Sequence, residues 1–216
     1  MDLESTDPCQ VSVDTFDRLA GNYARKYLGL DLYDAHYRRF AARLRHSGTV
    51  LDLACGPGNI SAFLARERPD LQLQGIDLAP AMVALAQAHV PSARFQVHDC
   101  RRLAELGQRF DGIAYAFGLN YIDDGAAQAL FVALPDALAD GGVLFLSTML
   151  GDPAQSGVLA SAQGDSIHLH YRCRDTVEAW VRSAGLHVVH AETIDSPPSA
   201  AKQTTDLVLV AERRGP

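Results

Sequence analysis

Apolar and polar residues recur along this chain with two different periods, and the order of those periods predicts its architecture. Between residues 14 and 46, apolar side chains recur every three or four positions, which is typical of amphipathic helices, and Gly29 separates two such segments. From residue 49 onward, short apolar runs of strand length alternate with stretches of helical period. The pattern therefore predicts a helical N-terminal segment followed by an α/β region.

The α/β region contains seven predicted strands. They fall at residues 49–55, 71–77, 93–100, 110–118, 141–149, 186–194 and 205–214. Helices are predicted at 59–67, 79–90, 125–139 and 175–185, and Pro135 is expected to kink or divide the third of these. The segment 150–165 is rich in Gly, Ser and Ala and is predicted to be a surface loop.

Alternating strands and helices predict one mostly parallel, doubly wound sheet with helices on both faces. Only the short segment 195–204 joins the last two strands, which is too little for a helical crossover. These two strands should therefore pair antiparallel, so that one strand of the seven is reversed. No internal repeat and no second domain is indicated.

Composition narrows the class of protein. The 216 residues are 48% hydrophobic and 21% charged, as in ordinary globular proteins, and the formal net charge of −7 disfavours a nucleic-acid backbone as partner. The four cysteines are scattered without a CxxC spacing, which predicts neither a zinc site nor a disulfide framework. The acidic start of the chain does not resemble a signal peptide, and no apolar run is long enough to span a membrane. We therefore expect a cytoplasmic protein.

The stretch VLDLACGPGNISAFLA, residues 50–65, reads as a strand, a glycine turn and the start of a helix. Such a turn lies at the carboxyl end of its strand, where open α/β sheets bind ligands. Glycines there allow close approach of the backbone, and the first amides of the helix face the ligand. The turn therefore predicts a nucleotide-like cofactor.

Two cofactor classes compete for this turn. A nicotinamide dinucleotide would place its pyrophosphate on the helix start, but the carboxylate of Asp52 would repel it, and Ser61 replaces the third glycine. The same carboxylate suits a ligand with ammonium and sulfonium charges, such as S-adenosylmethionine. Asp77 ends the second strand and can accept both ribose hydroxyls of either cofactor. Asp99 and Cys100 end the third strand, where they can meet an adenine.

The ordered set of motifs adds a resemblance. VLDLACGPGNIS, GIDLAPAMVALA, FQVHDC, FDGIAYAFGLNY and LADGGVLFLS follow one another along the chain. In order and spacing they resemble the class I, Rossmann-like S-adenosylmethionine-dependent methyltransferases, over residues 14–214. The resemblance is greatest to small bacterial enzymes with one domain and a helical N-terminal lid. It implies a single domain over 1–216, with a lid at 14–46 and a cofactor-binding core at 47–216.

The resemblance also implies a set of cofactor contacts. It assigns the methionine part to Asp52, Ala54, Gly56 and Gly58, the ribose to Asp77, the adenine to Leu78, Met82, Asp99 and Cys100, and the methionine amino group to Ala116 or Phe117. For Leu78 and Met82, a purely structural role in the core remains an alternative.

Candidate acceptor residues come from the lid and from the loops after the later strands. Four tyrosines share one short helical window; an aromatic stripe is more often core than binding surface, and here the two interpretations have about equal weight. We expect Tyr23 to face the sulfonium and Tyr33 and Tyr37 to face the methyl acceptor. Asn120 and Tyr121 follow the fourth strand and can orient an acceptor, although Asn120 also suits a turn. His168 and His170 share one strand face, as an acceptor wall or a solvated surface; without a third ligand no metal site is predicted.

The predicted function is methyl transfer from S-adenosylmethionine to a small molecule by in-line displacement. This chemistry depends on positioning, so no catalytic residue can be assigned from the sequence. The fourth motif reads AFGLNY, without the Pro-Pro-aromatic pattern of base-modifying enzymes, and nucleic acid is not expected as substrate. A binding module that does not transfer methyl and, less favoured, a nicotinamide-dependent oxidoreductase remain as alternatives.

Overall fold

The computed structural model describes residues 7–161, 164–197 and 203–214. The elements, in chain order, are α1 (Pro8–Tyr27), α2 (Asp34–Ala41), β1 (Thr49–Leu53), α3 (Asn59–Glu67), β2 (Gln72–Asp77), α4 (Pro80–His89), β3 (Arg94–Val97), η1 (Cys100–Leu106), β4 (Phe110–Ala116), η2 (Gly118–Tyr121), α5 (Asp124–Ala137), β5 (Leu138–Leu150), η3 (Pro153–Gln155), β6 (Gly157–Ala160), β7 (Ser166–Leu169), α6 (Arg174–Ser183), β8 (Leu186–Asp195) and β9 (Thr205–Arg213). Within the described ranges, no helix combines the length and the apolar character needed to cross a bilayer.

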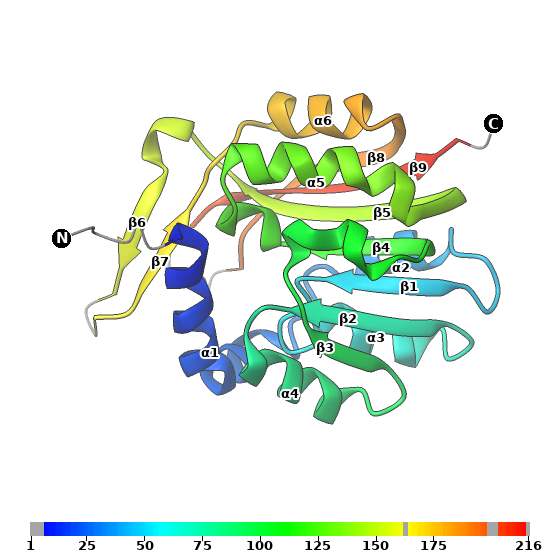
Figure 1. Cartoon of the computed structure of the whole chain (residues 1–216), viewed down its shortest axis with the longest axis horizontal. Helices are drawn as coiled ribbons and strands as arrows, with labels where there is room; N and C mark the ends of the chain where they lie inside the picture. Colours follow the sequence, from blue (N-terminus) through cyan, green and yellow to red (C-terminus); the bar gives the residue numbers. More distant parts are fainter. Residues whose placement is uncertain (1–6, 162–163, 198–202, 215–216) are drawn as a thin grey trace.

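Seven strands form one twisted sheet in the order β3-β2-β1-β4-β5-β9-β8 (Figure 1). The first five strands are parallel, and β9 runs antiparallel to both β5 and β8. The predicted fold class is therefore confirmed, including its single reversed strand. Because β2 and β4 lie on opposite sides of β1, the chain changes direction between β1 and β4, which makes the ends of these two strands the switch point of the sheet.

Strand residues alternate between two apolar layers. Leu51 and Leu53 of β1 pack with α5, α6 and η1, whereas Val50 packs with α2 and α3 on the opposite face. This is the two-residue period of a strand buried on both sides. Asp52 shares the face of Val50 and is thereby directed toward α3.

Three local expectations differ from the structure. Helix α1 begins at Pro8 because the Asp7 side chain accepts a hydrogen bond from Cys9 N and proline fits the first helical turn. Helix α5 runs unbroken through Pro135 to Ala137, since a proline in the last turn removes only one late hydrogen bond. The loop expected at 150–165 instead contributes β6, which pairs antiparallel with β7 and projects beside α1 (Figure 1).

Candidate functional site

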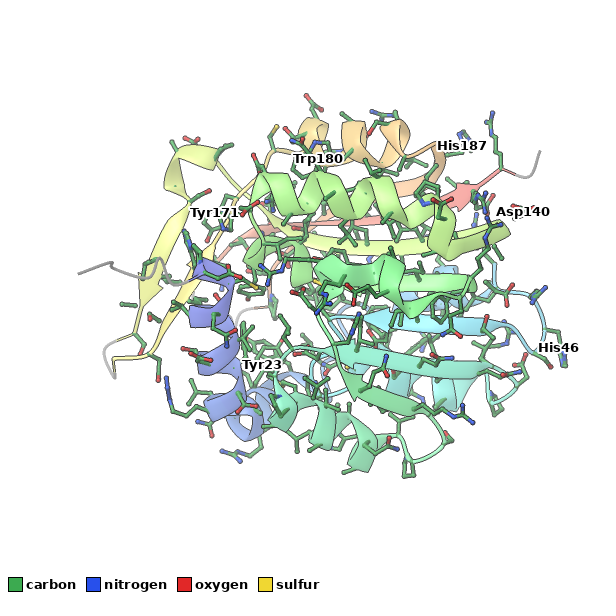
Figure 2. The ribbon with its side chains drawn as sticks, in the orientation of Figure 1. Tyr23, His46, Asp140, Tyr171, Trp180 and His187 are labelled. Atoms are coloured by element: carbon green, nitrogen blue, oxygen red, sulfur yellow. The ribbon has the colours of Figure 1, made fainter. Side chains whose placement is uncertain are left out.

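A cavity of about 430 Å³ opens at the carboxyl ends of β1 and β4, the switch point of the sheet. Its walls come from α1, α2, the turn after β1, the β6–β7 ribbon, and Ser196, Pro197, Thr204 and Asp206. Figure 2 places Tyr23 and Tyr171 at this end of the molecule, and His46 and Asp140 at the opposite end. Six of the seven tyrosines line the cavity: Tyr23, Tyr27, Tyr33, Tyr37, Tyr121 and Tyr171. Its size and aromatic lining are typical of a small-molecule site.

The glycine turn forms one wall. Ala54, Gly56 and Gly58 have φ angles of 57°, 53° and 87°, in the left-handed region. A Cβ added to Gly56 would meet no atom within 4 Å, so Gly56 exposes its backbone to the cavity. A Cβ on Gly58 would lie 3.2 Å from Ala86 Cα of α4, and Gly58 does not line the cavity. Gly56 therefore leaves room for a ligand, whereas Gly58 allows α3 and α4 to pack closely.

Asp52 is buried beside this turn. Its Oδ2 accepts hydrogen bonds from Ser61 N at 3.2 Å and Ser61 Oγ at 2.6 Å, which fixes the first turn of α3. No Lys, Arg or His in the described ranges forms an ion pair with Asp52, although Asp52 lines the cavity. Burial raises the pKa of Asp52 to about 7, since desolvation disfavours the charged form. The structure thus presents a carboxylate that a cationic ligand would stabilise.

Asp77 braces the same turn from β2. Its Oδ2 accepts from Gly56 N and its Oδ1 from Ala79 N, each at 2.9 Å. Burial raises the pKa of this carboxyl as well, against the opposing effect of those backbone donors. Asp77 does not itself line the cavity, but a carboxylate accepts about four hydrogen bonds, so acceptor sites remain for a ligand.

The four residues predicted to contact the adenine lie outside the cavity, and one of them, Met82, lies under α1. Met82 and Ala79 pack against Phe16, Ala20 and Tyr23, and Asp17 Oδ1 accepts from Ala81 N at 2.6 Å. Leu78 packs at the edge of the neighbouring core, as the structural alternative anticipated. Leu78, Met82, Asp99 and Cys100 are therefore absent from the lining of the cavity.

Asp99 and Cys100 have other partners in the structure. The Asp99 carboxylate caps η1 and pairs with Arg101, which also binds Asp7 at 2.6 Å. The Cys100 thiol is buried 4.0 Å from Tyr115 Oη, and burial raises its pKa to about 12. The third strand was predicted to end at Cys100, but β3 ends at Val97, so both residues lie beyond the strand, and their polar atoms are directed into protein contacts.

Ala116 ends β4 and Phe117 follows it, and both line the cavity together with the turn. Phe117 has φ 58°, an unusual conformation for a residue with a side chain, and its ring packs edge-on against Tyr33 at 5.3 Å between centroids. Gly118 follows, where a Cβ would lie 2.8 Å from Ala54 Cβ. The ends of β1 and β4 are therefore held close together, and backbone strain is concentrated there.

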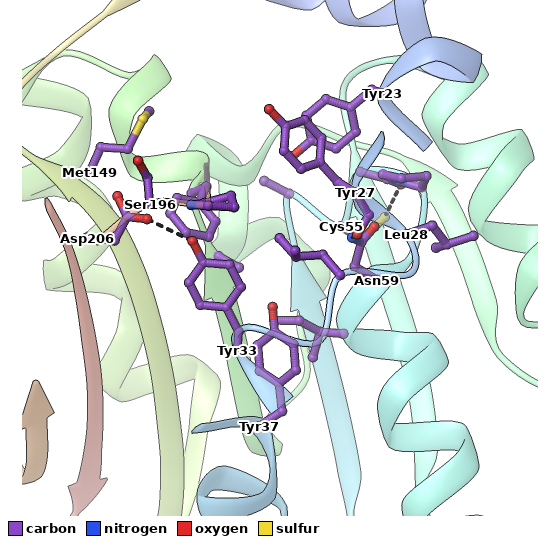
Figure 3. Close-up of a pocket in the computed structure, with 18 of the residues that line it drawn as sticks. Tyr23, Tyr27, Leu28, Tyr33, Tyr37, Cys55, Asn59, Met149, Ser196 and Asp206 are labelled. Atoms are coloured by element: carbon purple, nitrogen blue, oxygen red, sulfur yellow. Dashed lines mark hydrogen bonds between the residues drawn. The ribbon is translucent and has the colours of Figure 1, made fainter. Parts of the chain in front are cut away.

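The tyrosines predicted for the lid converge on the cavity (Figure 3). Tyr23 lies 4.7 Å from Tyr27 between ring centroids, on the side of the glycine turn. Tyr33 donates to Asp206 Oδ2 at 2.8 Å on the side of β9, and Tyr37 packs edge-on against Phe63 and Phe145 at 5.3 Å. Burial raises the pKa of Tyr23, Tyr33 and Tyr37 far above the ordinary value, so these phenols are neutral hydrogen-bond donors.

Among the other acceptor candidates, Tyr121 lines the cavity and Asn120 does not. The Asn120 side chain donates to the carbonyls of Met149 and His170 and accepts from Thr148 Oγ1 and Met149 N. All of its hydrogen-bonding capacity is used within the protein, which favours the structural alternative, and its part in orienting an acceptor stays a prediction. Its observed role is to join β5 to the segment after β7.

His168 and His170 share one face, with ring centroids 4.5 Å apart, as predicted. Their neighbours Ile167 and Leu169 line the cavity, whereas neither histidine does. Because successive strand residues point to opposite sides, the two histidines are directed away from the cavity. This placement favours the alternative of a solvated face, and their role as an acceptor wall stays a prediction.

Several lining residues carry no local signal in the sequence. Asp206 lies on β9, far along the chain from Tyr33, and its carboxylate also accepts from Thr204 Oγ1 at 2.9 Å. Asn59 donates to Tyr27 O at 2.8 Å and so joins α3 to the end of α1. Only the fold brings these residues to the cavity.

Comparison with known proteins agrees with this geometry. Residues 50–142 match the family described as "Methyltransferase domain". The chain is 38% identical to a trans-aconitate 2-methyltransferase of Variovorax paradoxus over 101 residues, which are 47% of this chain and 38% of the relative. It is 33% identical to a ubiquinone biosynthesis O-methyltransferase of Xanthomonas axonopodis pv. citri over 167 residues, or 68% of this chain and 66% of the relative. The chain thus matches well under half of the first relative.

Solved structures extend the comparison to the fold. An S-adenosylmethionine-dependent methyltransferase of Methanosarcina mazei superimposes with a TM-score of 0.72 at 17% identity, over 87% of this chain and 100% of that chain. At this identity the likeness is one of fold.

Proposed function

We propose that this chain, which belongs to the class I S-adenosylmethionine-dependent methyltransferases, transfers a methyl group to a small-molecule acceptor. One of the two relatives is named for methyl transfer to trans-aconitate, and the other is named as an O-methyltransferase of ubiquinone biosynthesis. Both names refer to small molecules. The enclosed, tyrosine-lined cavity supports an acceptor of the same size class.

One observation carries the choice of cofactor. Asp52 is a buried carboxylate with no cationic partner in the described ranges, and it lines the cavity at the glycine turn. A ligand with ammonium and sulfonium groups would supply the missing positive charge, whereas a pyrophosphate would add repulsion. The residues at the turn therefore fit S-adenosylmethionine and disfavour a nicotinamide dinucleotide.

The methionine half of the cofactor would lie along Asp52, Ala54 and Gly56, opposite Ala116 and Phe117, because these residues line the cavity together. The ribose half would approach Asp77, whose oxygens keep free acceptor sites. In the structure, side chains of α1 cover Met82 and the start of α4. We therefore propose that residues 14–46 act as a lid over the core and that α1 shifts when an adenine binds at Leu78 and Asp99.

S-adenosylmethionine supplies an activated methyl group on a sulfonium, so the protein needs chiefly to align the acceptor and exclude water. The lid tyrosines would enclose the reacting atoms, with the ring of Tyr23 toward the positive charge. On the other side, Tyr33 and Asp206 present a hydroxyl and a carboxylate to the acceptor. Burial raises the pKa of Asp206, so this carboxylate can receive a proton from an acceptor that must lose one.

The setting of the reaction is part of the proposal. All four cysteines are free thiols, three of them buried, which supports a reducing, cytoplasmic location. The net charge of −7 argues against nucleic acid as partner.

The test is release of S-adenosylhomocysteine from S-adenosylmethionine over a panel of amines, phenols, thiols and carboxylates. At least one acceptor class should raise release above the background without acceptor. With that acceptor, Asp206→Asn should lower kcat/KM for the acceptor but leave cofactor affinity unchanged, and Asp136→Asn, at an exposed position of α5, should alter neither. If the cofactor binds and no acceptor raises release, the protein is a cofactor-binding module without transferase activity.

A further inference from the structure

Two histidines and a glutamate form a cluster outside the cavity, where α2 covers the edge of the sheet. One ring nitrogen each of His36 and His190 and one carboxylate oxygen of Glu192 lie within 4.8 Å of one another. His36 belongs to α2, whereas His190 and Glu192 belong to β8. None of the three lines the cavity, so the cluster is separate from the proposed methyl-transfer site.

A β-bulge brings the two β8 residues to the face of α2. The pairing of β8 with β9 shifts between Val188 and His190. Val188 and Ala191 pack on the α5–α6 side of the sheet, whereas Val189 and Ile194 pack on the α2 side. Without the extra residue, His190 and Glu192 would share the face of Val188 and point away from His36.

The cluster leaves polar atoms without partners. His36 is 7% exposed, and its Nδ1 has no hydrogen-bond partner. His190 Nε2 is buried without a hydrogen-bond partner among the described residues, and Glu192 Oε2 lies 3.5 Å from it. A buried imidazole nitrogen without a partner costs free energy, and a bound cation would remove that cost for both rings.

We propose that His36, His190 and Glu192 bind a divalent transition-metal ion, with zinc as the representative species. Two imidazoles and one carboxylate are an established ligand set for zinc, with water completing the tetrahedron. Ligands about 2.0–2.2 Å from zinc lie roughly 3.3–3.6 Å from one another, so the cluster must contract by about 1 Å. The Glu192 side chain is 50% exposed and can move by this amount.

Nearby cations do not prevent binding. The positive charge of Arg39 lies near both histidines and would repel a bound cation. The Arg39 side chain is exposed, however, so solvent screens this charge. Arg43 pairs with Glu212 at 3.1 Å.

A metal ion bound by this cluster would fasten α2 to β8. Helix α2 carries Tyr37 and follows Tyr33, and both tyrosines line the cavity. The proposal holds whether or not the chain transfers methyl groups.

The test is a calorimetric titration of zinc chloride into the full, untagged, metal-free chain. We expect one zinc ion per chain and an increase in melting temperature. Glu192→Gln and His190→Gln should each weaken binding at least about tenfold, since even indirect partners of a metal ligand contribute that much. Two controls should bind as the unaltered chain does: His168→Gln, from the other histidine pair, and Cys173→Ser, the exposed thiol.

Three results would overturn the assignment. The first is no saturable zinc binding by the unaltered chain. The second is binding that survives in both Glu192→Gln and His190→Gln, which would place the ion elsewhere. The third is binding lost in His168→Gln or Cys173→Ser while Glu192→Gln retains it.

Discussion

The hydroxyl of Tyr33 donates a 2.8 Å hydrogen bond to Oδ2 of Asp206, joining the start of α2 to β9 across 173 positions of sequence. Both residues are buried, and no cation pairs with Asp206 in the part of the chain that the structure describes. The phenol is therefore a principal stabilising partner of this carboxylate in the cavity wall.

Tyr33→Phe should lower the free energy of unfolding by about 1–3 kcal/mol, because it removes a hydrogen bond from a buried carboxylate. Equilibrium urea unfolding measures the change. Tyr27→Phe is the matched control, since the Tyr27 hydroxyl makes no hydrogen bond with any of the residues that the structure describes, and it should change stability by less than about 0.5 kcal/mol. Equal effects of the two substitutions would argue against the Tyr33–Asp206 bond.

The pH dependence of cofactor affinity should follow Asp52. The pKa of Asp52 in the folded protein is about 7, above the ordinary value of 3.8. Between these two pH values the folded protein retains a proton that the unfolded chain has lost, so the free energy of unfolding falls as pH rises from 3.8 to about 7. A cationic ligand binds the ionised form, so affinity for S-adenosylmethionine should fall about tenfold per pH unit below 7.

The control for this pH effect is Asp52→Asn, which can still accept from Ser61 but does not titrate. It should bind the cofactor weakly and with little change between pH 6 and 8, measured by calorimetry. A parallel pH dependence in both proteins would assign the titration to another group.

Asp77→Ala should weaken cofactor affinity by about 10- to 100-fold, the effect of losing charge-assisted hydrogen bonds worth about 1.5–3 kcal/mol. The substitution also frees Gly56 N and Ala79 N, which the carboxylate now holds. Equilibrium binding of S-adenosylhomocysteine gives the measurement, with Asp136→Asn as the unaffected control. Affinity equal to that of the unaltered chain would place the ribose elsewhere.

The two glycines of the turn should respond differently to alanine. Gly58→Ala combines an unfavourable φ of 87° with a 3.2 Å contact to Ala86, and should cost about 2–3 kcal/mol of folding free energy. In Gly56→Ala the added methyl group meets no protein atom, so backbone strain alone should cost about 1–2 kcal/mol of folding free energy. The methyl group would instead occupy space that the ligand needs. Urea unfolding and cofactor titration together distinguish them; a larger stability loss for Gly56→Ala would contradict this assignment.

Local features of the sequence were sufficient to predict the strand–turn–helix at residues 49–67 and the reversed strand, because periodicity and loop length determine both. The cavity itself was predicted only in part. Tyr33 and Asp206 meet through strand order rather than through a motif, and a bulge at Val189 directs His190 toward α2. Strand β6 was missed because residues 157–160 have neither strong strand propensity nor alternation, whereas its partner β7 includes His168, which was expected on a strand.

The central claim is that the carboxylate beside the glycine turn selects a cationic methyl donor over a dinucleotide. The most direct test is calorimetric titration of the purified chain at pH 8 with S-adenosylmethionine and, separately, with oxidised nicotinamide adenine dinucleotide. Saturable binding of S-adenosylmethionine at one site per chain, with none of the dinucleotide, is the predicted result. Tight binding of the dinucleotide without any of S-adenosylmethionine would contradict the account.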